Sequence, residues 1–88
     1  MSRVDPHCAL RRALARRYPG LTILTSRSTD WASATFVGAR HELDCVAGCD
    51  LSGIEDEVFD LRGHLVADVA LLQGDDRLRI EALTIEAE

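Results

Sequence analysis

The stretch from Gly63 to Glu88, GHLVADVALLQGDDRLRIEALTIEAE, constrains the fold more than any other part of the chain. Two aliphatic and β-branched runs flank Gly74-Asp75, which predicts a β-hairpin with a two-residue turn. In that register one side of the hairpin is apolar throughout, and a slip of one residue would set charged side chains against apolar ones. The predicted apolar pairs are Leu71 with Leu78, Val69 with Ile80, and Ala67 with Ala82.

The opposite side of this hairpin also has an apolar end. It consists of Val66, Leu83 and Ile85, and Phe36 of the preceding hairpin can extend it. Left in water, such a patch would expose on the order of a few hundred Å² of apolar surface, which is large for a small monomer. We therefore expect a second copy of the chain to cover it, sheet against sheet about a twofold axis. A bend of the chain itself and a different partner protein are the alternatives.

The first twenty residues predict a helix over residues 6–17. Asp5 and Pro6 are typical of a helix start, and the tripeptide YPG at 18–20 is typical of a helix stop. One face of this helix carries apolar side chains and a histidine, and the arginines occupy the other face. We expect the first face to lie on the core, through His7, Leu10, Ala13, Leu14 and Tyr18.

The middle of the chain predicts a hairpin and a second helix. Residues 21–29 and 33–46 read as strands around TDWA, and residues 51–59 as a short helix, because Ser52 and Glu55 have the spacing of a capping box. The expected fold is α+β, a four-stranded mainly antiparallel sheet in the order α-β-β-α-β-β with two helices on one face; the strand order in the sheet stays open. The core side of the second strand is expected to hold Val37, Ala39, His41, Leu43 and Cys45.

The composition is that of a globular protein in a reducing compartment. The chain has 47% apolar and 28% charged residues, and its three cysteines argue against a disulfide framework. Residues 1–20 lack the pattern of a secretory signal, and no apolar run approaches the ~20 residues of a membrane span. Every basic residue is arginine, with neither lysine nor asparagine present, which suggests GC-rich bacterial coding. We expect a single cytoplasmic domain over residues 1–88, with no membrane contact.

The most informative polar positions are Asp68 and Glu81, which the predicted register places opposite each other. Like charges across a ladder cost up to about 1 kcal/mol relative to neutral pairs, so a compensating group is expected. Arg79, or Arg40 from the first hairpin, could bridge the two carboxylates as the polar part of an interface. Alternatively, the carboxylates share a proton or bind a cation or small ligand, with His64 nearby. All five are candidate ligand-binding residues.

Other chemistries are disfavoured. His41 and Cys45 lie four residues apart on one strand, about 13 Å at strand rise, which is too far to ligate one ion. Cys45 and Cys49 form only a C-x3-C motif, and Cys8, in the first turn of the helix, lacks a well-placed base. The net charge of -5 opposes nucleic-acid binding through the arginines of the first helix. No metal or cofactor is expected.

These observations predict a small non-catalytic interaction or regulatory module that forms a homodimer through its sheet face. No nucleotide-binding, metalloprotease or nucleophile-elbow motif is present, so catalysis is disfavoured. The alternative from another class is an enzyme or small-ligand binder that uses a polar pocket at the interface around Asp68 and Glu81.

Overall fold

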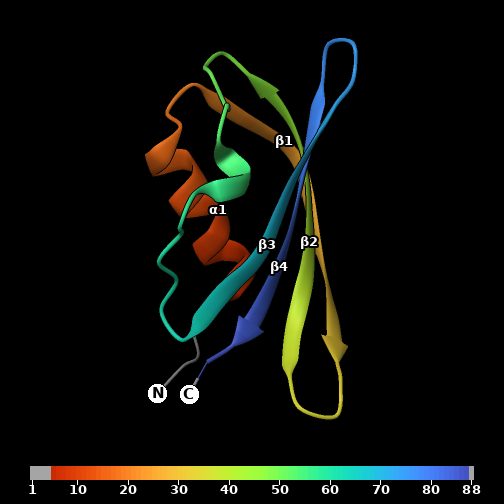
Figure 1. Cartoon of the computed structure of the whole chain (residues 1–88). Helices are drawn as coiled ribbons and strands as arrows, with labels where there is room; N and C mark the ends of the chain where they lie inside the picture. Colours follow the sequence, from red (N-terminus) through yellow and green to blue (C-terminus); the bar gives the residue numbers. More distant parts are fainter. Residues whose placement is uncertain (1–4, 88) are drawn as a thin grey trace.

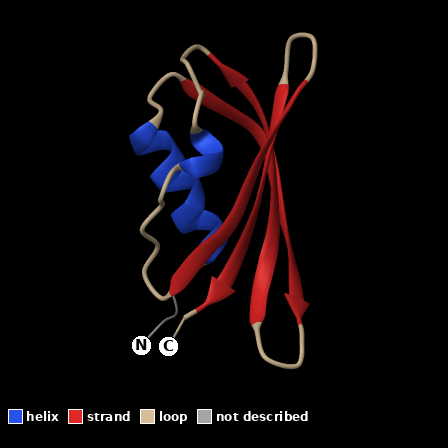
Figure 2. Cartoon of the chain, viewed as in Figure 1, coloured by secondary structure: helices blue, strands red, loops and turns tan. Residues whose placement is uncertain are grey.

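The computed structural model describes residues 5–87, in which one helix packs on one face of a four-stranded antiparallel sheet (Figures 1 and 2). The strands lie in the order β1-β2-β4-β3, so β1 and β3 form the edges of the sheet. The segment after β2 crosses the α1 side of the sheet to reach β3 (Figure 1). The elements are α1 (Pro6–Arg17), β1 (Leu21–Ala32), β2 (Val37–Ala47), η1 (Ile54–Asp56), β3 (His64–Gln73) and β4 (Leu78–Glu86).

The predicted first helix is confirmed, including its start and its buried face. The Asp5 carboxylate accepts a hydrogen bond of 3.0 Å from the backbone N–H of His7, and Pro6 occupies the first turn. The helix ends at Arg17, where the Tyr18 N–H still bonds to the Leu14 carbonyl. Its core-facing side chains are buried as expected, namely Leu10, Ala13, Leu14 and Tyr18.

Replacing Asp5 with alanine is expected to lower the free energy of unfolding by about 1 kcal/mol, because the first turn of α1 then loses its side-chain acceptor. Urea unfolding followed by circular dichroism measures the change. Asp5→Ser is the matched variant, since a serine oxygen can accept the same bond and should recover most of the loss. Equal losses in both variants would show that Asp5 acts through its charge rather than as a cap.

The second predicted helix is wrong, so one helix and not two covers the sheet. Between β2 and β3 the chain forms only the 3-10 turn η1. Ser52 donates both its N–H and its hydroxyl to Asp50, at 2.9 and 2.6 Å, and Gly53 has a φ of 81°, so no α-helix begins there. Val58, which lies within the range predicted to be helical, is 89% exposed. The segment nevertheless buries Leu51, Ile54, Phe59 and Leu61.

The first hairpin forms, but its turn lies later in the chain than TDWA, where the turn was predicted. The Ser33 N–H bonds to the Phe36 carbonyl at 2.8 Å, so the turn lies at 33–36 and Trp31 belongs to β1. The predicted core side of β2 is confirmed over most of its length, although Val37 is 49% exposed. The buried members are Ala39, His41, Leu43 and Cys45.

The second hairpin has a longer turn than predicted. β3 ends at Gln73 and β4 begins at Leu78, so four residues rather than two connect the strands, and within this turn the Gly74 N–H bonds to the Arg77 carbonyl at 2.8 Å. Val69 therefore lies opposite Ala82 instead of Ile80. Because this shift is two residues, side chains from position 69 onward keep their predicted faces. The like-charge pair is nevertheless lost, since the structure sets Asp68 opposite Leu83.

A β-bulge at Ala67 reverses the faces of the first residues of β3. The register changes between Val66 and Asp68, so Val66 pairs with Thr84 and packs against the core. The prediction that Val66 lies on the far side is therefore wrong, and Leu65 takes that place instead. His64 also moves to the α1 side, where it pairs with Glu86 rather than Ile85.

The core fills the space between α1, the η1 segment and the sheet. The largest fully buried apolar side chains come from all three parts. This core stabilises the fold by removing apolar area from water, and it uses only one face of the sheet. Its buried members are Leu10, Ala13, Leu14, Tyr18, Leu43, Cys45, Leu51, Ile54, Phe59, Leu61, Val69, Ile80 and Ala82.

Candidate functional site

The candidate site is the sheet face turned away from α1, here called the open face, which no described element covers (Figure 2). The strand pairings place three regions along it. We call them the apolar end (Trp31, Leu65, Leu83, Ile85), the depression (around Arg40, Asp68 and Glu81) and the charged band (Arg27, Glu42, Asp44, Arg79).

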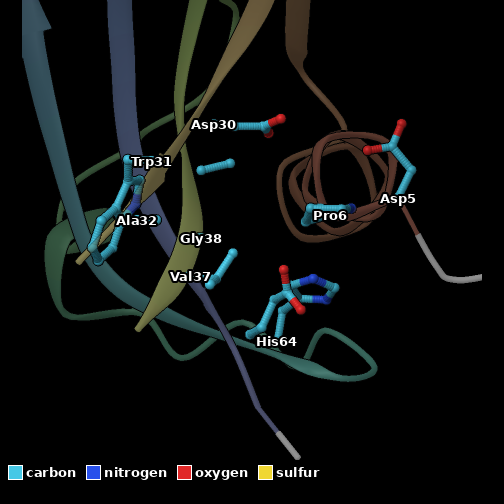
Figure 3. Close-up of a pocket in the computed structure, with 10 residues that line it drawn as sticks. Asp5, Pro6, Asp30, Trp31, Ala32, Val37, Gly38 and His64 are labelled. Atoms are coloured by element: carbon cyan, nitrogen blue, oxygen red, sulfur yellow. The ribbon is translucent and has the colours of Figure 1, made fainter. Parts of the chain in front are cut away.

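The apolar end forms a row across all four strands. Trp31 lies opposite Gly38, Gly38 opposite Ile85, and Ile85 opposite Leu65. Directly opposed residues of an antiparallel sheet point to the same face, so these side chains lie together. Figure 3 shows the Trp31 ring on the side of the sheet away from α1. Leu65 is 61% exposed, although it is an aliphatic residue in a strand.

The charged band is electrostatically satisfied within the chain. Arg79 bonds to Asp44 at 2.9 Å and to Glu42 at 3.3 Å, and Arg27 also binds Glu42. Hydrogen bonding to Arg27 lowers the pKa of Glu42, and hydrogen bonding to Arg79 lowers the pKa of Asp44. A like-charge pair does occur across the ladder, but it joins Glu42 to Glu81, and these two arginines compensate it.

The depression is a hollow of about 310 Å³ between the apolar end and the charged band. Arg40, Asp68 and Glu81 line it, so three of the five predicted ligand-binding residues do lie together. Within residues 5–87, Arg40 and Asp68 take part in no ion pair or side-chain hydrogen bond. The remaining lining residues are Thr29, His41, Glu42, Ala70, Ala82 and Leu83.

The other two predicted site residues lie elsewhere. Arg79 belongs to the charged band, where it bridges Asp44 and Glu42 instead of Asp68 and Glu81. His64 lies on the opposite side of the sheet, because the bulge at Ala67 turned it there. Of the predicted contact residues, Leu83 and Ile85 lie on the open face, and Phe36 is 53% exposed in the turn beside the apolar end.

His64 lines a second hollow, a cleft of about 670 Å³ between the start of α1 and the end of the sheet (Figure 3). Asp5 and Pro6 approach it from the helix, and Asp30 from β1. His64 and Glu86 lie opposite each other on β3 and β4, and both line this cleft. Three acidic side chains and one imidazole thus share the walls of this open cleft with apolar residues of β1 and β2.

A hydrogen-bonded chain of side chains, the histidine relay (Ser26, His7, His41, Thr84), joins α1 to the sheet. The two imidazoles share an Nδ1–Nδ1 hydrogen bond of 2.9 Å, and their rings lie 10° from parallel. His7 Nε2 lies 2.9 Å from the Ser26 hydroxyl, and His41 Nε2 lies 2.9 Å from the Thr84 hydroxyl. The polar atoms of this buried chain are therefore all paired.

The donor and the acceptor of each hydrogen bond in the relay are assigned from its Thr84 end. With the Thr84 hydroxyl donating to the Ala39 carbonyl at 3.4 Å, its oxygen accepts from His41 Nε2–H. His41 Nδ1 then carries no proton and accepts from His7 Nδ1–H, which leaves His7 Nε2 to accept from Ser26. Burial lowers the pKa of His41 from 6.5 to about 4, and burial together with Arg11 lowers that of His7.

Sequence reasoning placed both histidines of the relay on core-facing sides but did not join them. One signal could have joined them: both imidazoles were expected to face the core, where each ring needs hydrogen-bond partners for two nitrogens. Pairing across α1 and β2 satisfies both rings without a metal ion.

The cysteines offer no joint site. Cys45 is buried, and burial raises its thiol pKa to about 11, whereas Cys8 is exposed on α1. Cys49, which lies past the end of β2, is partly buried, and all three thiols are free. Over residues 5–87, no group of three or more histidine, cysteine or acidic side chains has the arrangement of a metal site.

Comparison with protein-family models, with curated proteins and with solved structures finds no match to this chain. Among the described residues, no helix combines the length and apolar character that crossing a membrane requires. The open face and its three regions are therefore the basis for assigning a function to this chain.

Proposed function

We propose that this protein is a small interaction module that works as a homodimer, joined through the open face of its sheet. The observation that carries the proposal is the apolar end: Trp31, Leu65, Leu83 and Ile85 share a sheet face that no described element covers. Burying such a row against an identical row removes apolar area from water in both copies at once.

The size of the open face supports this proposal. Four strands about 4.8 Å apart and about ten residues long span roughly 600 Å² in projection. Side-chain relief increases this area, which approaches the ~800 Å² per partner of a standard stable interface. The regions also combine the two components expected of an interface, an apolar contact area at one end of the face and polar groups beside it, which include the Arg79 ion pairs.

Sedimentation velocity tests the proposal directly. At micromolar concentration the protein should sediment with twice the 9.7 kDa mass of the chain. Replacing Leu83 with glutamate places a charge in the middle of the buried contact and should raise the dimer dissociation constant about 100-fold or more. Circular dichroism should stay unchanged, because Leu83 points away from the core.

Val58→Glu is the matched control for this substitution. Val58 is also an exposed aliphatic residue, but it lies in the segment between β2 and β3 on the α1 side of the sheet (Figure 1). The Val58→Glu protein should remain a dimer. A wild-type protein that sediments as a monomer would refute the proposal and leave the depression free for the alternative role, binding of a small ligand.

A further inference from the structure

We infer that Arg40 and Asp68 form reciprocal ion pairs between the two copies, and that these pairs fix the position of the twofold axis along β4. This inference rests on the proposed homodimer and specifies how its sheets meet. Each copy contributes one arginine and one aspartate, so the dimer contains two identical pairs, as an isologous interface requires.

The strand register makes the two positions symmetric about one residue. Arg40 on β2 and Asp68 on β3 both lie directly opposite Leu83 on β4. Their Cα atoms therefore stand one strand spacing, about 4.8 Å, on either side of Leu83. A twofold axis that runs along β4 exchanges these two sides, and it sets Arg40 of one copy above Asp68 of the other.

The same axis also sets the two β4 residues of the apolar end against their own counterparts. Leu83 then faces Leu83 of the second copy, and Ile85 faces Ile85 of the second copy. Packed sheets lie about 10 Å apart, a distance within the combined reach of an extended arginine and an aspartate. An axis across the strands instead would set Ile85 against Glu81, which buries a carboxylate against an aliphatic side chain.

The charges of the depression leave the Asp68 carboxylate available to Arg40 of a second copy. Glu42 is already bound by Arg27 and Arg79, whereas Asp68 has no ion pair in the part of the chain that the structure describes. Glu81, on the neighbouring row, lies in the same hollow. Arg40 of a second copy therefore enters a hollow with acidic walls, pairs with Asp68, and offsets the approach of the two Glu81 carboxylates near the axis.

A charge exchange between chains tests the inference. Arg40→Asp alone creates two aspartate-aspartate contacts per dimer, and Asp68→Arg alone creates two arginine-arginine contacts. Each single variant should raise the dimer dissociation constant at least about tenfold in sedimentation equilibrium. An equimolar mixture of the two single variants should dimerise with about wild-type affinity, because every contact in the mixed dimer joins opposite charges.

The mixture separates a contact between chains from one within a chain. If Arg40 and Asp68 acted on each other within one copy, the double variant R40D/D68R would recover but the mixture would not. Arg16→Asp on the exposed side of α1 makes the same change of net charge as Arg40→Asp and should leave the dissociation constant unchanged. Unfolding midpoints of each variant show whether any loss of dimer comes from a loss of fold.

The outcomes for this inference and for the homodimer are distinct. A dimer that Leu83→Glu disrupts but that neither single charge variant weakens would overturn the reciprocal pairs and leave the proposed function standing. A mixture that stays monomeric while the single variants are folded would also overturn them. A monomeric wild-type protein would overturn the homodimer, and the ion pairs with it.

Discussion

Replacing Gly38 with alanine is expected to lower the free energy of unfolding by about 3 kcal/mol or more, at the upper end of overpacking effects. Gly38 is buried in β2, between β1 and β4. A Cβ atom at this position would overlap the backbone carbonyl of Thr84, and it would lie 3.0 Å from the indole Nε1 of Trp31. A backbone carbonyl within a sheet cannot rotate away, so the two strands would have to separate.

Guanidinium unfolding followed by the fluorescence of the single tryptophan measures this loss. Gly48→Ala is the matched control: its nearest atom, the Gly20 carbonyl oxygen, is 3.3 Å from the added Cβ, so the loss should stay below about 1 kcal/mol. Combining Trp31→Ala with Gly38→Ala separates the two obstacles, with circular dichroism as the signal. If removing the indole restored stability, the side chain rather than the Thr84 backbone would be the obstacle.

The missing side chain at Gly38 also leaves room for the Trp31 indole on the open face. With no side chain at Gly38, the indole covers the backbone of the central strand and takes the space that a Cβ would occupy. The open face consequently has a large aromatic group at its apolar end. A substitution at Gly38 therefore tests the sheet and the candidate site together.

The sequence predicted which face of its helix or strand a residue occupies better than it predicted which residue lies opposite it in the sheet. The buried positions of α1 and the alternation of Ala39, His41 and Leu43 follow directly from helical and strand periodicity. The turn was centred one residue too early, because GDDR is polar throughout and does not mark the centre, and this error shifts the pairing by two residues. Since side chains alternate with a period of two, such a shift moves no apolar side chain to the wrong face. Periodicity alone cannot resolve a register error of that kind.

The alternation of apolar and polar residues could not predict the bulge at Ala67, for a different reason. Alanine fits either face of a sheet, so the run Val66-Ala67-Asp68 carries no contradiction that would reveal an extra residue. One unpaired residue was enough to move His64 and Val66 to the α1 side. The bulge therefore removed His64 from the predicted site, whereas Arg40, Asp68 and Glu81 stayed together.

The second predicted helix does not form because other hydrogen bonds compete with those of its first turn. Ser52 and Glu55 have the spacing of a capping box, but Asp50 accepts both donors of Ser52 first. Gly53 then adopts a left-handed conformation, and the Glu55 carboxylate instead accepts the backbone N–H of Leu71 at 3.3 Å. The apolar residues of the segment still reach the core, because burial requires only their position and not a helix.

Lowering the pH from about 7.5 to about 5 is expected to destabilise the fold by about 2 kcal/mol through His41 alone. Burial holds the pKa of His41 at about 4 in the folded protein, against 6.5 in an unfolded chain. Below pH 6.5 the unfolded chain takes up a proton that folded His41 cannot accept. This stabilisation is therefore complete above pH 6.5 and is lost progressively as the pH falls toward 4.

His7 acts in the same direction, because burial and the nearby Arg11 lower its pKa, while Asp5 opposes them. The chain of hydrogen bonds leaves His7 Nε2, not His41, as the site for an added proton, since a second proton on Nδ1 of His41 would oppose the Nδ1–H of His7. Nitrogen NMR at neutral pH should find His41 protonated at Nε2 and His7 at Nδ1. The opposite tautomers would contradict this direction.

Urea unfolding of the wild-type protein and of His41→Gln, over about pH 5 to 7.5, isolates the histidine contribution. Glutamine retains one donor and one acceptor for Thr84 and His7 but cannot titrate, so the variant should start less stable and lose about 2 kcal/mol less over this range. The range stops above the region where the arginine-paired Glu42 and Asp44 become protonated, because their pKa values are lowered. Parallel pH profiles for the two proteins would mean that the relay does not couple protonation to folding.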